Sequence, residues 1–428
     1  MIDVIGIGIG PANLGLAALL EEYEDVSCCF FEQETEFAWH PGMLIKGTDL
    51  QVSFLADLVT MANPRSRYTF LNYLHESNRL HRFYTFEQFD IPRREFNEYL
   101  SWVAGELDSC QFGMKVEEVT DCQGGYLVKV RRLKDGSLSE YRAKHVVLGT
   151  GSKPMIPVDV PDAAPDAALP YVTHSSRYLE QQKELHEAEA VTVIGSGQSA
   201  AEIFLDLLQH QKKGQQLSWF TRSSEFRELE TAELGQELFT PKYVEYFHSL
   251  PYEERMNTLP RLTGLRNGID ASTLSRIYQE LYHRSVSGEE PSVIIQPMTE
   301  LEAIQVEENQ SLKLHLKQWQ LKKEKSITVD RVVLATGYKP NIPAWFSAYE
   351  PLIEWESEEH FKVTEDFRLV FKDKRPHHFF TFTHLDHSHG TAATNLKLSI
   401  YRNQKVIQTI RGGKEAPVKQ ETAFQQFE

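Results

Sequence analysis

Three glycines near the amino terminus have the spacing of a nucleotide-binding turn. Gly6, Gly8 and Gly10 follow an apolar run and precede residues 13–20, which have the composition of a buried helix. A glycine turn between a strand and a helix exposes backbone N–H groups, and the helix dipole adds partial positive charge, so such a unit can bind a pyrophosphate. Asn13 takes the place of the third glycine of the G-x-G-x-x-G pattern, so the motif by itself is weak evidence.

An acidic residue strengthens this interpretation. A second apolar strand is predicted over residues 26–31 and ends in Glu32. Glu32 follows Gly8 at about the distance where an acid accepts hydrogen bonds from an adenosine ribose in such folds. Strand, turn, helix and acid together favour a dinucleotide site, here for FAD, over a glycine turn in some other α/β fold.

A second unit of the same kind begins near residue 190. An apolar strand leads into Gly195-x-Gly197-x-x-Ala200 and a helical stretch. The next predicted strand, residues 217–221, ends in Arg222 where the first unit has an acid. An arginine can pair with the 2′-phosphate of NADPH, which an acid would repel; a surface arginine without a ligand is the alternative. Two such units in one chain predict a flavoprotein that is reduced by NADPH.

Length and composition fit this class. A chain of 428 residues is too long to fold around one compact core, so two or three domains are expected. The net charge of −16 argues against nucleic acid as a partner and weakly favours a cationic substrate. No apolar run is long enough to span a membrane, and the first residues enter a strand directly, without a signal peptide. The cysteines have no metal or redox spacing, and Cys28 and Cys29 lie in a predicted strand, which indicates a reducing cytoplasm.

The elements that must position these residues form an α/β protein with two Rossmann-like dinucleotide-binding domains, one for FAD and one for NADPH. A small, mostly helical insertion in the NADPH domain is the predicted site of substrate recognition. The predicted boundaries are 1–185 for the first part of the FAD domain, 186–228 and 290–334 for the NADPH domain, 229–289 for the insertion, 335–411 for the return to the FAD domain and 412–428 for a frayed polar tail.

Six motifs are spread over nearly the whole chain. They are Gly8-x-Gly10-Pro11-x-Asn13-Leu14, Trp39-His40-Pro41-Gly42-Met43, Phe70-Leu-Asn-Tyr-Leu74, Gly195-Ser-Gly-Gln-Ser-Ala200-Ala-Glu, Ile277-Tyr-Gln-Glu-Leu-Tyr-His-Arg284 and the Asp-x3-Leu-Ala-Thr-Gly-Tyr-x4-Pro pattern of residues 330–343. In these motifs the chain resembles the flavin-dependent N-hydroxylating monooxygenases, the lysine and ornithine N-monooxygenase family of siderophore biosynthesis.

The resemblance implies FAD and NADPH as cofactors, and O₂ and an amine as substrates. In that family a C4a-hydroperoxyflavin offers an electrophilic oxygen to the amine nitrogen, and the protein orients the reactants and excludes water. It also implies a homo-oligomer, a tetramer or a dimer. The implied cofactor-binding residues are Gly8, Gly10, Pro11, Asn13, Glu32, Trp39, His40, Met43, Gln51, Gly195, Gly197, Gln198, Ser199, Arg222, Thr336, Gly337, Tyr338, His389, Gly390 and Leu396.

One departure from the family concerns the substrate. In its amino-acid hydroxylases, the segment that matches residues 54–60 carries a lysine at the third place, which binds the substrate α-carboxylate; this chain has Ala56. A buried carboxylate without its partner costs several kcal/mol. We therefore expect a diamine such as putrescine, cadaverine or diaminopropane, unless Arg65, Lys242 or Lys397 replaces that lysine. The substrate-binding candidates are Gln51, Ala56, Gln236, Asn267 and Lys397, of which Gln51 and Asn267 are also candidate supports for catalysis.

Two further functions and a metal site are the alternatives to this prediction. The same chemistry on L-lysine N6 or L-ornithine N5 is the first alternative, and a flavoprotein reductase or NADPH oxidase is the second. A disulfide reductase would need a Cys-x4-Cys pair, which the chain lacks. Five carboxy-terminal histidines match no common metal-binding spacing, so no metal site is expected from the sequence; they are His377, His378, His384, His387 and His389. Residues 389–390 and the following helix are instead expected to direct a helix N-terminus at the flavin.

Overall fold

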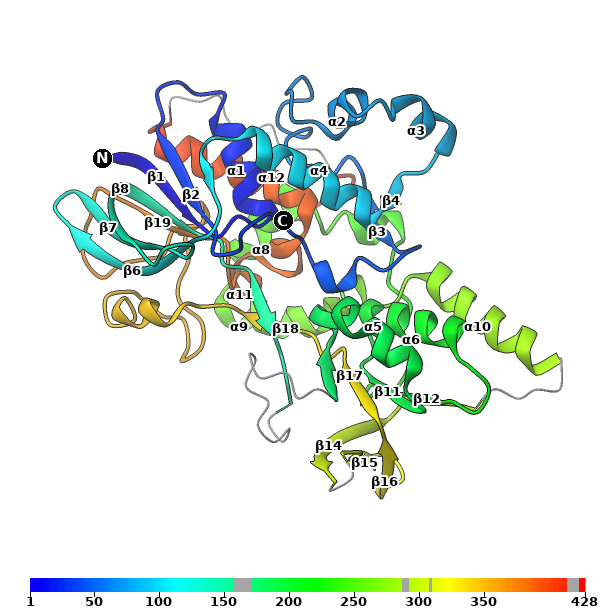
Figure 1. Cartoon of the computed structure of the whole chain (residues 1–428). Helices are drawn as coiled ribbons and strands as arrows, with labels where there is room; N and C mark the ends of the chain where they lie inside the picture. The colour runs from blue at the N-terminus through cyan, green and yellow to red at the C-terminus, as the bar shows by residue number, and fades with distance from the viewer. Residues whose placement is uncertain (158–170, 287–291, 308–309, 414–422, 428) are drawn as a thin grey trace.

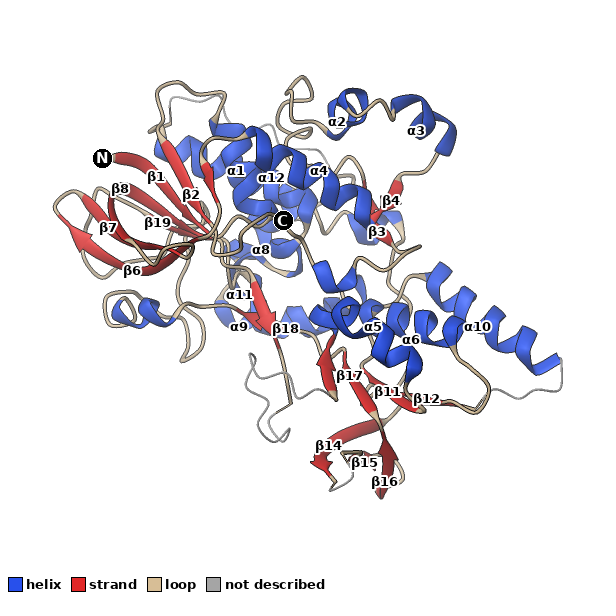
Figure 2. Cartoon of the chain, viewed as in Figure 1, coloured by secondary structure: helices blue, strands red, loops and turns tan. Residues whose placement is uncertain are grey.

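The computed structural model describes residues 1–157, 171–286, 292–307, 310–413 and 423–427. It contains two α/β units, which lie at the upper left and lower right of Figure 1. Each unit is built on its own sheet, with helices packed against it (Figure 2), so the predicted α/β class with two dinucleotide-binding folds is confirmed. No helix within the described ranges is both long and apolar enough to cross a bilayer.

The first unit is organised by a seven-stranded sheet. Its order is β5-β2-β1-β8-β7-β6, with β19 beside β8. The strands are β1 (Ile2–Ile7), β2 (Cys28–Phe31), β5 (Cys110–Gln111), β6 (Met114–Cys122), β7 (Gly125–Arg132), β8 (Leu138–Leu148) and β19 (Phe379–Thr381). β1 pairs in parallel with β2 and β8, whereas β6, β7 and β8 pair antiparallel, as the alternating sequence of residues 112–147 predicts.

Helices α1 (Pro11–Leu20), α4 (Arg93–Glu106) and α12 (Leu396–Ile410) pack together on this sheet. Every residue of α1 from Asn13 onward is buried, which explains its apolar composition on all faces. The remaining elements of this part of the chain are β3 (Asp49–Ser53), β4 (Asp90–Pro92), α2 (Phe70–Glu76) and α3 (Leu80–Phe86).

The second unit is a five-stranded parallel sheet of order β10-β17-β11-β12-β13. Its strands are β10 (Val172–His174), β11 (Ala190–Ile194), β12 (Gln216–Phe220), β13 (Val293–Gln296) and β17 (Arg331–Leu334). Its helices are α5 (Tyr178–Glu187), α6 (Gln198–His210) and α10 (Ala271–Val286). A three-stranded antiparallel sheet adjoins it, formed by β14 (Thr299–Val306), β15 (Leu312–Gln318) and β16 (Lys323–Val329).

The predicted boundary at residue 185 is wrong. β10 pairs with β17, and α5 packs on α6, so both belong to the second unit. The sequence did not show this because β10 has only three residues and its partner strand lies far along the chain. The two crossings between the units pair with each other as β9 (Ser152–Pro154) and β18 (Tyr338–Pro340). The predicted linker 158–170 lies outside the described residues.

The helical insertion is divided between the two units. Helices α8 (Pro241–Ser249) and α9 (Tyr252–Thr258) pack on the short helix α11 (Asp386–His389) of the first unit, whereas α10 packs on α6. α7 (Glu233–Gln236) precedes α8 and is contacted by the carboxy-terminal residues.

The sequence predicts a frayed tail, but the carboxy-terminal residues 423–427 make defined contacts with the rest of the protein. The backbone N–H groups of Phe424 and Gln425 donate to the Glu237 carboxylate at 2.9 and 2.8 Å, and the Phe427 ring lies 5.1 Å from that of Tyr243. These contacts attach the end of the chain to the helical insertion. Residues 414–422 and 428 of the predicted tail lie outside the described residues.

Candidate active site between the two nucleotide-binding units

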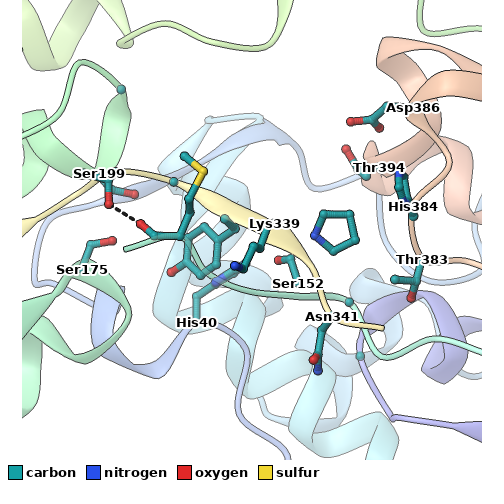
Figure 3. Close-up of a pocket in the computed structure, with 18 of the residues that line it drawn as sticks. His40, Ser152, Ser175, Ser199, Lys339, Asn341, Thr383, His384, Asp386 and Thr394 are labelled. Carbon is teal, nitrogen blue, oxygen red and sulfur yellow. Dashed lines mark hydrogen bonds between the residues drawn. The ribbon is translucent and has the colours of Figure 1, made fainter. Parts of the chain in front are cut away.

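Residues from both units line one large cavity of about 2100 Å³. Its wall includes both glycine turns, the crossings at β9 and β18, and the start of α12. Figure 3 shows Thr383, His384, Asp386 and Thr394 on one side of this cavity, with Ser199 on the other. The sequence elements that were predicted to bind two separate nucleotides therefore face a common space.

The first glycine turn has a backbone that a side chain would obstruct. Gly8 has a φ of +86°, and a Cβ atom there would lie 2.5 Å from the Gly149 carbonyl oxygen. The Asn13 amide donates to the Gly8 carbonyl at 2.8 Å and fills the space beside Gly149. Asn13 is fully buried and does not line the cavity, so it closes the turn from behind. Gly8, Gly10 and Pro11 line the cavity as predicted.

Glu32 lies at the end of β2 and lines the same part of the cavity. Its Oε2 atom accepts a hydrogen bond from the backbone N–H of Ile9 at 2.9 Å, and its Oε1 atom accepts one from Glu34 at 3.1 Å. The carboxylate is thus fixed between the strand end and the glycine turn. A carboxylate in this position can accept hydrogen bonds from a ribose, and that role of Glu32 stays a prediction from the sequence.

The second glycine turn is equally tight. Gly195 has a φ of +149°, and a Cβ atom there would lie 2.3 Å from the Ala335 carbonyl oxygen. Gly197 caps α6, and with Gln198 and Ser199 it lines the cavity. The Gln198 side chain also joins α6 to α10, because it donates to Thr273 at 3.1 Å and accepts from the backbone of Asp270 at 2.8 Å.

Arg222 lines the cavity at the end of β12, as the sequence predicts. Its backbone carbonyl accepts a hydrogen bond from the Trp319 indole at 2.8 Å, which fixes the loop that carries it. Ser223, Ser224 and Arg227 line the cavity beside it. Two guanidinium groups and two hydroxyls provide the donors that a phosphate monoester requires.

The central part of the cavity contains Trp39, His40 and Tyr338. The His40 ring lies 4.9 Å from that of Trp39 and 6.0 Å from that of Tyr338. The His40 side chain is exposed to the cavity, and the protein atoms around it lower its pKa from the ordinary value. Thr336, Gly337 and Gln51 also line the cavity, as predicted.

Met43 was predicted beside them but does not line the cavity. Met43 is the last residue of a short 3-10 turn, Pro41–Met43. It is only 3% exposed, and its side chain packs in the core of the second unit.

The start of α12 faces the cavity, but the preceding histidine turn does not. Asn395 caps the helix by accepting from the N–H of Lys397 at 2.9 Å, and Asn395 and Leu396 line the cavity. His389 and Gly390 lie outside its wall, contrary to the prediction. The His389 ring is buried against that of Phe367 at 4.1 Å, and burial and the neighbouring His248 keep its pKa well below the usual value.

The predicted substrate-binding residues are also divided. Gln51 and Asn267 line the cavity, whereas Ala56, Gln236 and Lys397 do not. Ala56 is 5% exposed and lies in a turn held by the buried Asp57 carboxylate. The Gln236 amide donates to the Glu230 carbonyl at 2.9 Å.

Several cavity residues were missed by the sequence analysis. Arg402 is 5% exposed; its Nη1 atom donates to the Ala393 carbonyl at 2.7 Å, and its guanidinium lies 4.6 Å from the centre of the Phe382 ring. Burial lowers its pKa to about 10. Asp386 pairs with Arg266 at 2.5 Å. No local sequence signal distinguishes Arg402 and Asp386 from ordinary charged residues of helices and loops. Other cavity residues that the sequence analysis missed are Ser152, Ser175, Lys339, Asn341 and Thr383.

The residues present fit two dinucleotides. Neither glycine turn has a Cβ atom that would keep a pyrophosphate away from its backbone. The N-termini of α1 and α6 follow these turns at the cavity wall. An acid stands at the end of the second strand of the first unit, and an arginine stands at the corresponding place in the second. The chemistry of these donors and acceptors agrees with FAD at the first turn and NADPH at the second.

Comparisons with known proteins lead in the same direction. Residues 1–340 match the family described as L-lysine 6-monooxygenase/L-ornithine 5-monooxygenase. The chain is 38% identical over 429 residues to a putrescine N-hydroxylase of Shewanella oneidensis, with 99% of this chain and 84% of the relative covered. A putrescine N-hydroxylase of Acinetobacter baumannii is 33% identical, with 99% and 93% covered.

Solved structures agree with these relatives. The FAD-bound cadaverine monooxygenase of the desferrioxamine pathway from Erwinia amylovora has a TM-score of 0.92 and 34% identity, and 99% of this chain and 98% of that chain are covered. The ornithine N-hydroxylase of Kutzneria sp. 744, solved with reduced FAD, NADP⁺ and L-ornithine, has a TM-score of 0.89 and 26% identity, with 97% and 100% covered.

Proposed function

Because the chain belongs to the L-lysine 6-monooxygenase/L-ornithine 5-monooxygenase family, a group of FAD- and NADPH-dependent N-hydroxylases, we propose that it hydroxylates one primary amine of a small aliphatic diamine. Putrescine, cadaverine and diaminopropane are the candidates, and the N-hydroxydiamine would supply hydroxamate siderophore synthesis. The names of the relatives support this choice, since two are putrescine N-hydroxylases and one is a cadaverine monooxygenase.

The observation that carries the proposal is a sequence difference: residue 56 is alanine where the amino-acid hydroxylases of the family carry a lysine, and Ala56 itself does not line the cavity. The bases that could replace such a lysine also lie elsewhere. Arg65 is exposed, Lys242 donates to Gln426 at 2.8 Å, and neither they nor Lys397 line the cavity. Of the basic residues that line the cavity, Arg266 is paired with Asp386, and Arg402 donates through Nη1 to the Ala393 carbonyl. A dicationic substrate fits such a site better than an amino acid does.

When bound, reduced FAD activates O₂ and supplies the oxygen atom that the amine nitrogen receives. The chain's residues must bind the amine, orient its lone pair and keep water out. A free alkyl ammonium has a pKa of about 10.4, so the reacting nitrogen must lose a proton. The side-chain oxygens of Gln51 and Asn267 can accept hydrogen bonds from the neutral amine.

Burial lowers the pKa of the cavity residue His384, which disfavours a positive charge on this ring beside a cationic substrate.

The proposal is tested by measuring hydroxylamine formation with cadaverine, putrescine, L-lysine and L-ornithine, alongside NADPH consumption and H₂O₂ release. We expect a diamine to give the highest kcat/KM. A preference for an amino acid would overturn the substrate assignment. NADPH oxidation without any hydroxylated product would instead favour the reductase or oxidase alternative.

A substitution tests the role of Ala56 directly. Ala56→Lys should leave FAD content unchanged and shift the preference toward amino acids, because it restores a partner for their carboxylate. Met61→Lys is the matched control, since Met61 is 40% exposed on the same segment and should not alter selectivity. Unchanged selectivity in Ala56→Lys would contradict the carboxylate argument, and Lys115→Ala and Lys339→Ala would then test the two lysines that line the cavity.

The proposed enzyme acts in the cytoplasm as a homo-oligomer, a dimer or a tetramer, as the family resemblance implies. Analytical ultracentrifugation of the FAD-loaded protein measures the assembly state, and a monomer at working concentration would contradict that part of the proposal.

A further inference from the structure

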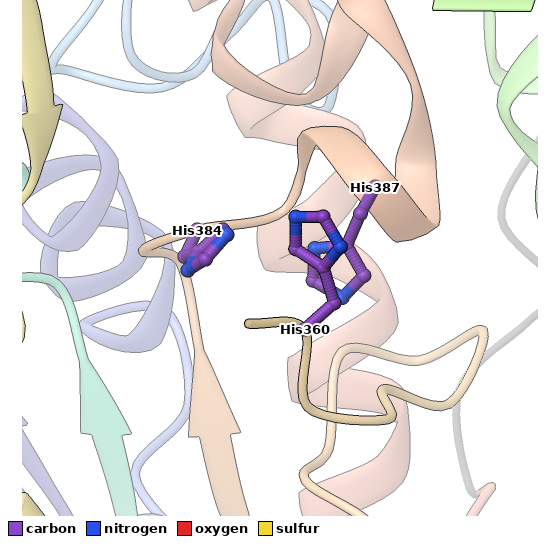
Figure 4. Close-up of side chains that lie close together, drawn as sticks. All are labelled: His360, His384 and His387. Atoms are coloured by element: carbon purple, nitrogen blue, oxygen red, sulfur yellow. The ribbon is translucent and has the colours of Figure 1, made fainter. Parts of the chain in front are cut away.

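Three histidines from two separate segments lie together beside the cavity. His360 belongs to a loop that follows the crossing to the first unit, His384 follows β19, and His387 lies in α11. One ring nitrogen of each can be chosen so that all three lie within 4.8 Å of one another. Figure 4 shows the three imidazoles gathered in this cluster.

The hydrogen bonds of His387 leave one nitrogen free to act as a ligand. Its Nε2 atom lies 2.8 Å from the Phe361 carbonyl oxygen, which can only accept, so Nε2 carries the proton and Nδ1 keeps its lone pair. Nδ1 has no hydrogen-bond partner among the described residues, although the side chain is only 1% exposed. A buried acceptor without a partner is costly, and a bound cation would satisfy it.

The other two histidines complete the set. His360 Nδ1 lies 2.7 Å from the Tyr252 hydroxyl and 3.3 Å from the Ser357 hydroxyl, and when Nδ1 donates to one of these oxygens Nε2 keeps its lone pair for a ligand bond. His384 lines the main cavity.

We propose that His360, His384 and His387 bind one late first-row divalent metal ion, such as Zn²⁺ or Co²⁺. Imidazole ligands suit these ions, and three histidines with one open position form a common protein site for them. A carbonyl that fixes the second ring nitrogen, as Phe361 fixes that of His387, is the usual outer partner of a metal-bound histidine. Because His384 is part of the cavity wall, the site adjoins the cavity.

Binding requires a local change in ring orientation. The His360 and His387 rings are stacked at 4.6 Å with an interplanar angle of 12°. A metal ion lies in the plane of each imidazole that binds it, so two parallel rings must tilt before their lone pairs meet at one ion. Tetrahedral Zn–N bonds of about 2.0 Å also place ligand nitrogens about 3.3 Å apart, so the rings must approach each other.

A second cluster, formed by His186, Asp206 and His210, lacks this property. Its Asp206 Oδ2 atom already accepts hydrogen bonds from Tyr178, Gln182 and His186. His210 is the most exposed of the three and serves as a control.

The test measures Zn²⁺ binding to the full-length FAD-loaded protein, without an affinity tag, by calorimetry, and Co²⁺ binding by its visible absorption bands. The wild type is expected to bind one ion at this site. His360→Asn and His384→Asn should weaken binding at least about 10-fold, whereas His210→Asn should not change it. Asparagine tolerates the φ of +61° at residue 384, and FAD content and melting temperature report whether each variant folds.

Three results would overturn the proposal: no metal binding by the wild type, unchanged affinity in His360→Asn, or an equal loss in His210→Asn. A consequence for catalysis follows if the proposed function also holds. An ion at this site adds positive charge to the cavity, so Zn²⁺ should raise the diamine KM in the wild type and not in His360→Asn. If Zn²⁺ binds without raising that KM, the metal site stands and the competition with the amine is wrong.

Discussion

The two nucleotide-binding units use the same strand–turn–helix but complete it in different ways. In the first, Asn13 closes the turn from behind, and Asn403 of α12 donates to the Ala12 carbonyl at 3.0 Å, so a helix from the far end of the chain holds α1 in place. In the second, Gln198 joins α6 to α10 of the same unit. The first turn is therefore stabilised by the return of the chain, and the second by its own unit.

The charges at the two strand ends also differ. Glu32 presents a carboxylate in the first unit, and Arg222 presents a guanidinium in the second. The backbone of each turn can bind a pyrophosphate. The side chains at the strand ends select the nucleotide, because a carboxylate suits a ribose hydroxyl and a guanidinium suits a 2′-phosphate. Binding of a dinucleotide and choice of the dinucleotide are thus carried by different residues, which can be separated by substitution.

The largest expected effects come from the two glycines. Gly8→Ala places a Cβ atom 2.5 Å from a backbone oxygen at positive φ, which we expect to cost about 3 kcal/mol, or roughly 100-fold in FAD affinity. Gly195→Ala should leave FAD bound but raise the KM for NADPH by a similar factor. Flavin absorbance of the purified variants and steady-state kinetics measure these effects. Loss of FAD from both variants would show that the two sites are not independent.

The next effect tests the choice of NADPH. Arg222→Ala should raise the KM for NADPH roughly 30-fold, because about 2 kcal/mol of charge-assisted hydrogen bonding is lost, and should change the KM for NADH much less. Lys213→Ala removes an exposed charge from the same unit and should affect neither. Equal effects on both nucleotides would remove the role assigned to Arg222.

A smaller effect is expected from the acid of the first unit. Glu32→Gln keeps an oxygen that can accept from the Ile9 N–H but loses the negative charge. We expect FAD to bind roughly 5-fold more weakly, for a loss of about 1 kcal/mol, with no change in the KM for NADPH. Fluorescence titration of the apoprotein with FAD measures this difference, and an altered NADPH response would contradict the separation of the sites.

A further effect concerns acid stability. In the first unit, His145 Nδ1 accepts a hydrogen bond from the backbone N–H of His378 at 3.0 Å. Burial, together with the neighbouring His378 ring, lowers the pKa of His145 to about 3. Between about pH 6.5 and pH 3 the unfolded chain binds this proton and the folded chain does not, so stability falls as the pH falls. At pH 5 the loss is about 2 kcal/mol.

The variant His145→Asn should therefore reduce the difference in melting temperature between pH 7.5 and pH 5, because it removes the titrating ring. His210→Asn, in the second unit, should not reduce it. A pH dependence that is unchanged in His145→Asn would show that other groups cause the acid sensitivity of the first unit.

Much of the site could be predicted because its signals are local. A glycine at positive φ, a buried strand and the residue that ends it all lie within one strand–turn–helix unit, and Gly8, Glu32, Gly195 and Arg222 are found where they were expected. Met43 and His389 were assigned from motifs alone. Both side chains pack into a core, because a motif specifies neighbours along the chain and not the direction in which each side chain points.

By itself, the sequence determined the two nucleotide-binding turns, the different charges beside them, and the missing cation at Ala56. Only the tertiary structure decided that both turns line one cavity, that Arg402 and Asp386 belong to its wall, and that His360 meets His384 and His387. The physical reason is the range of the interactions. Backbone conformation and periodicity act over a few residues, whereas a site between two units is formed by side chains that packing brings together from distant parts of the chain.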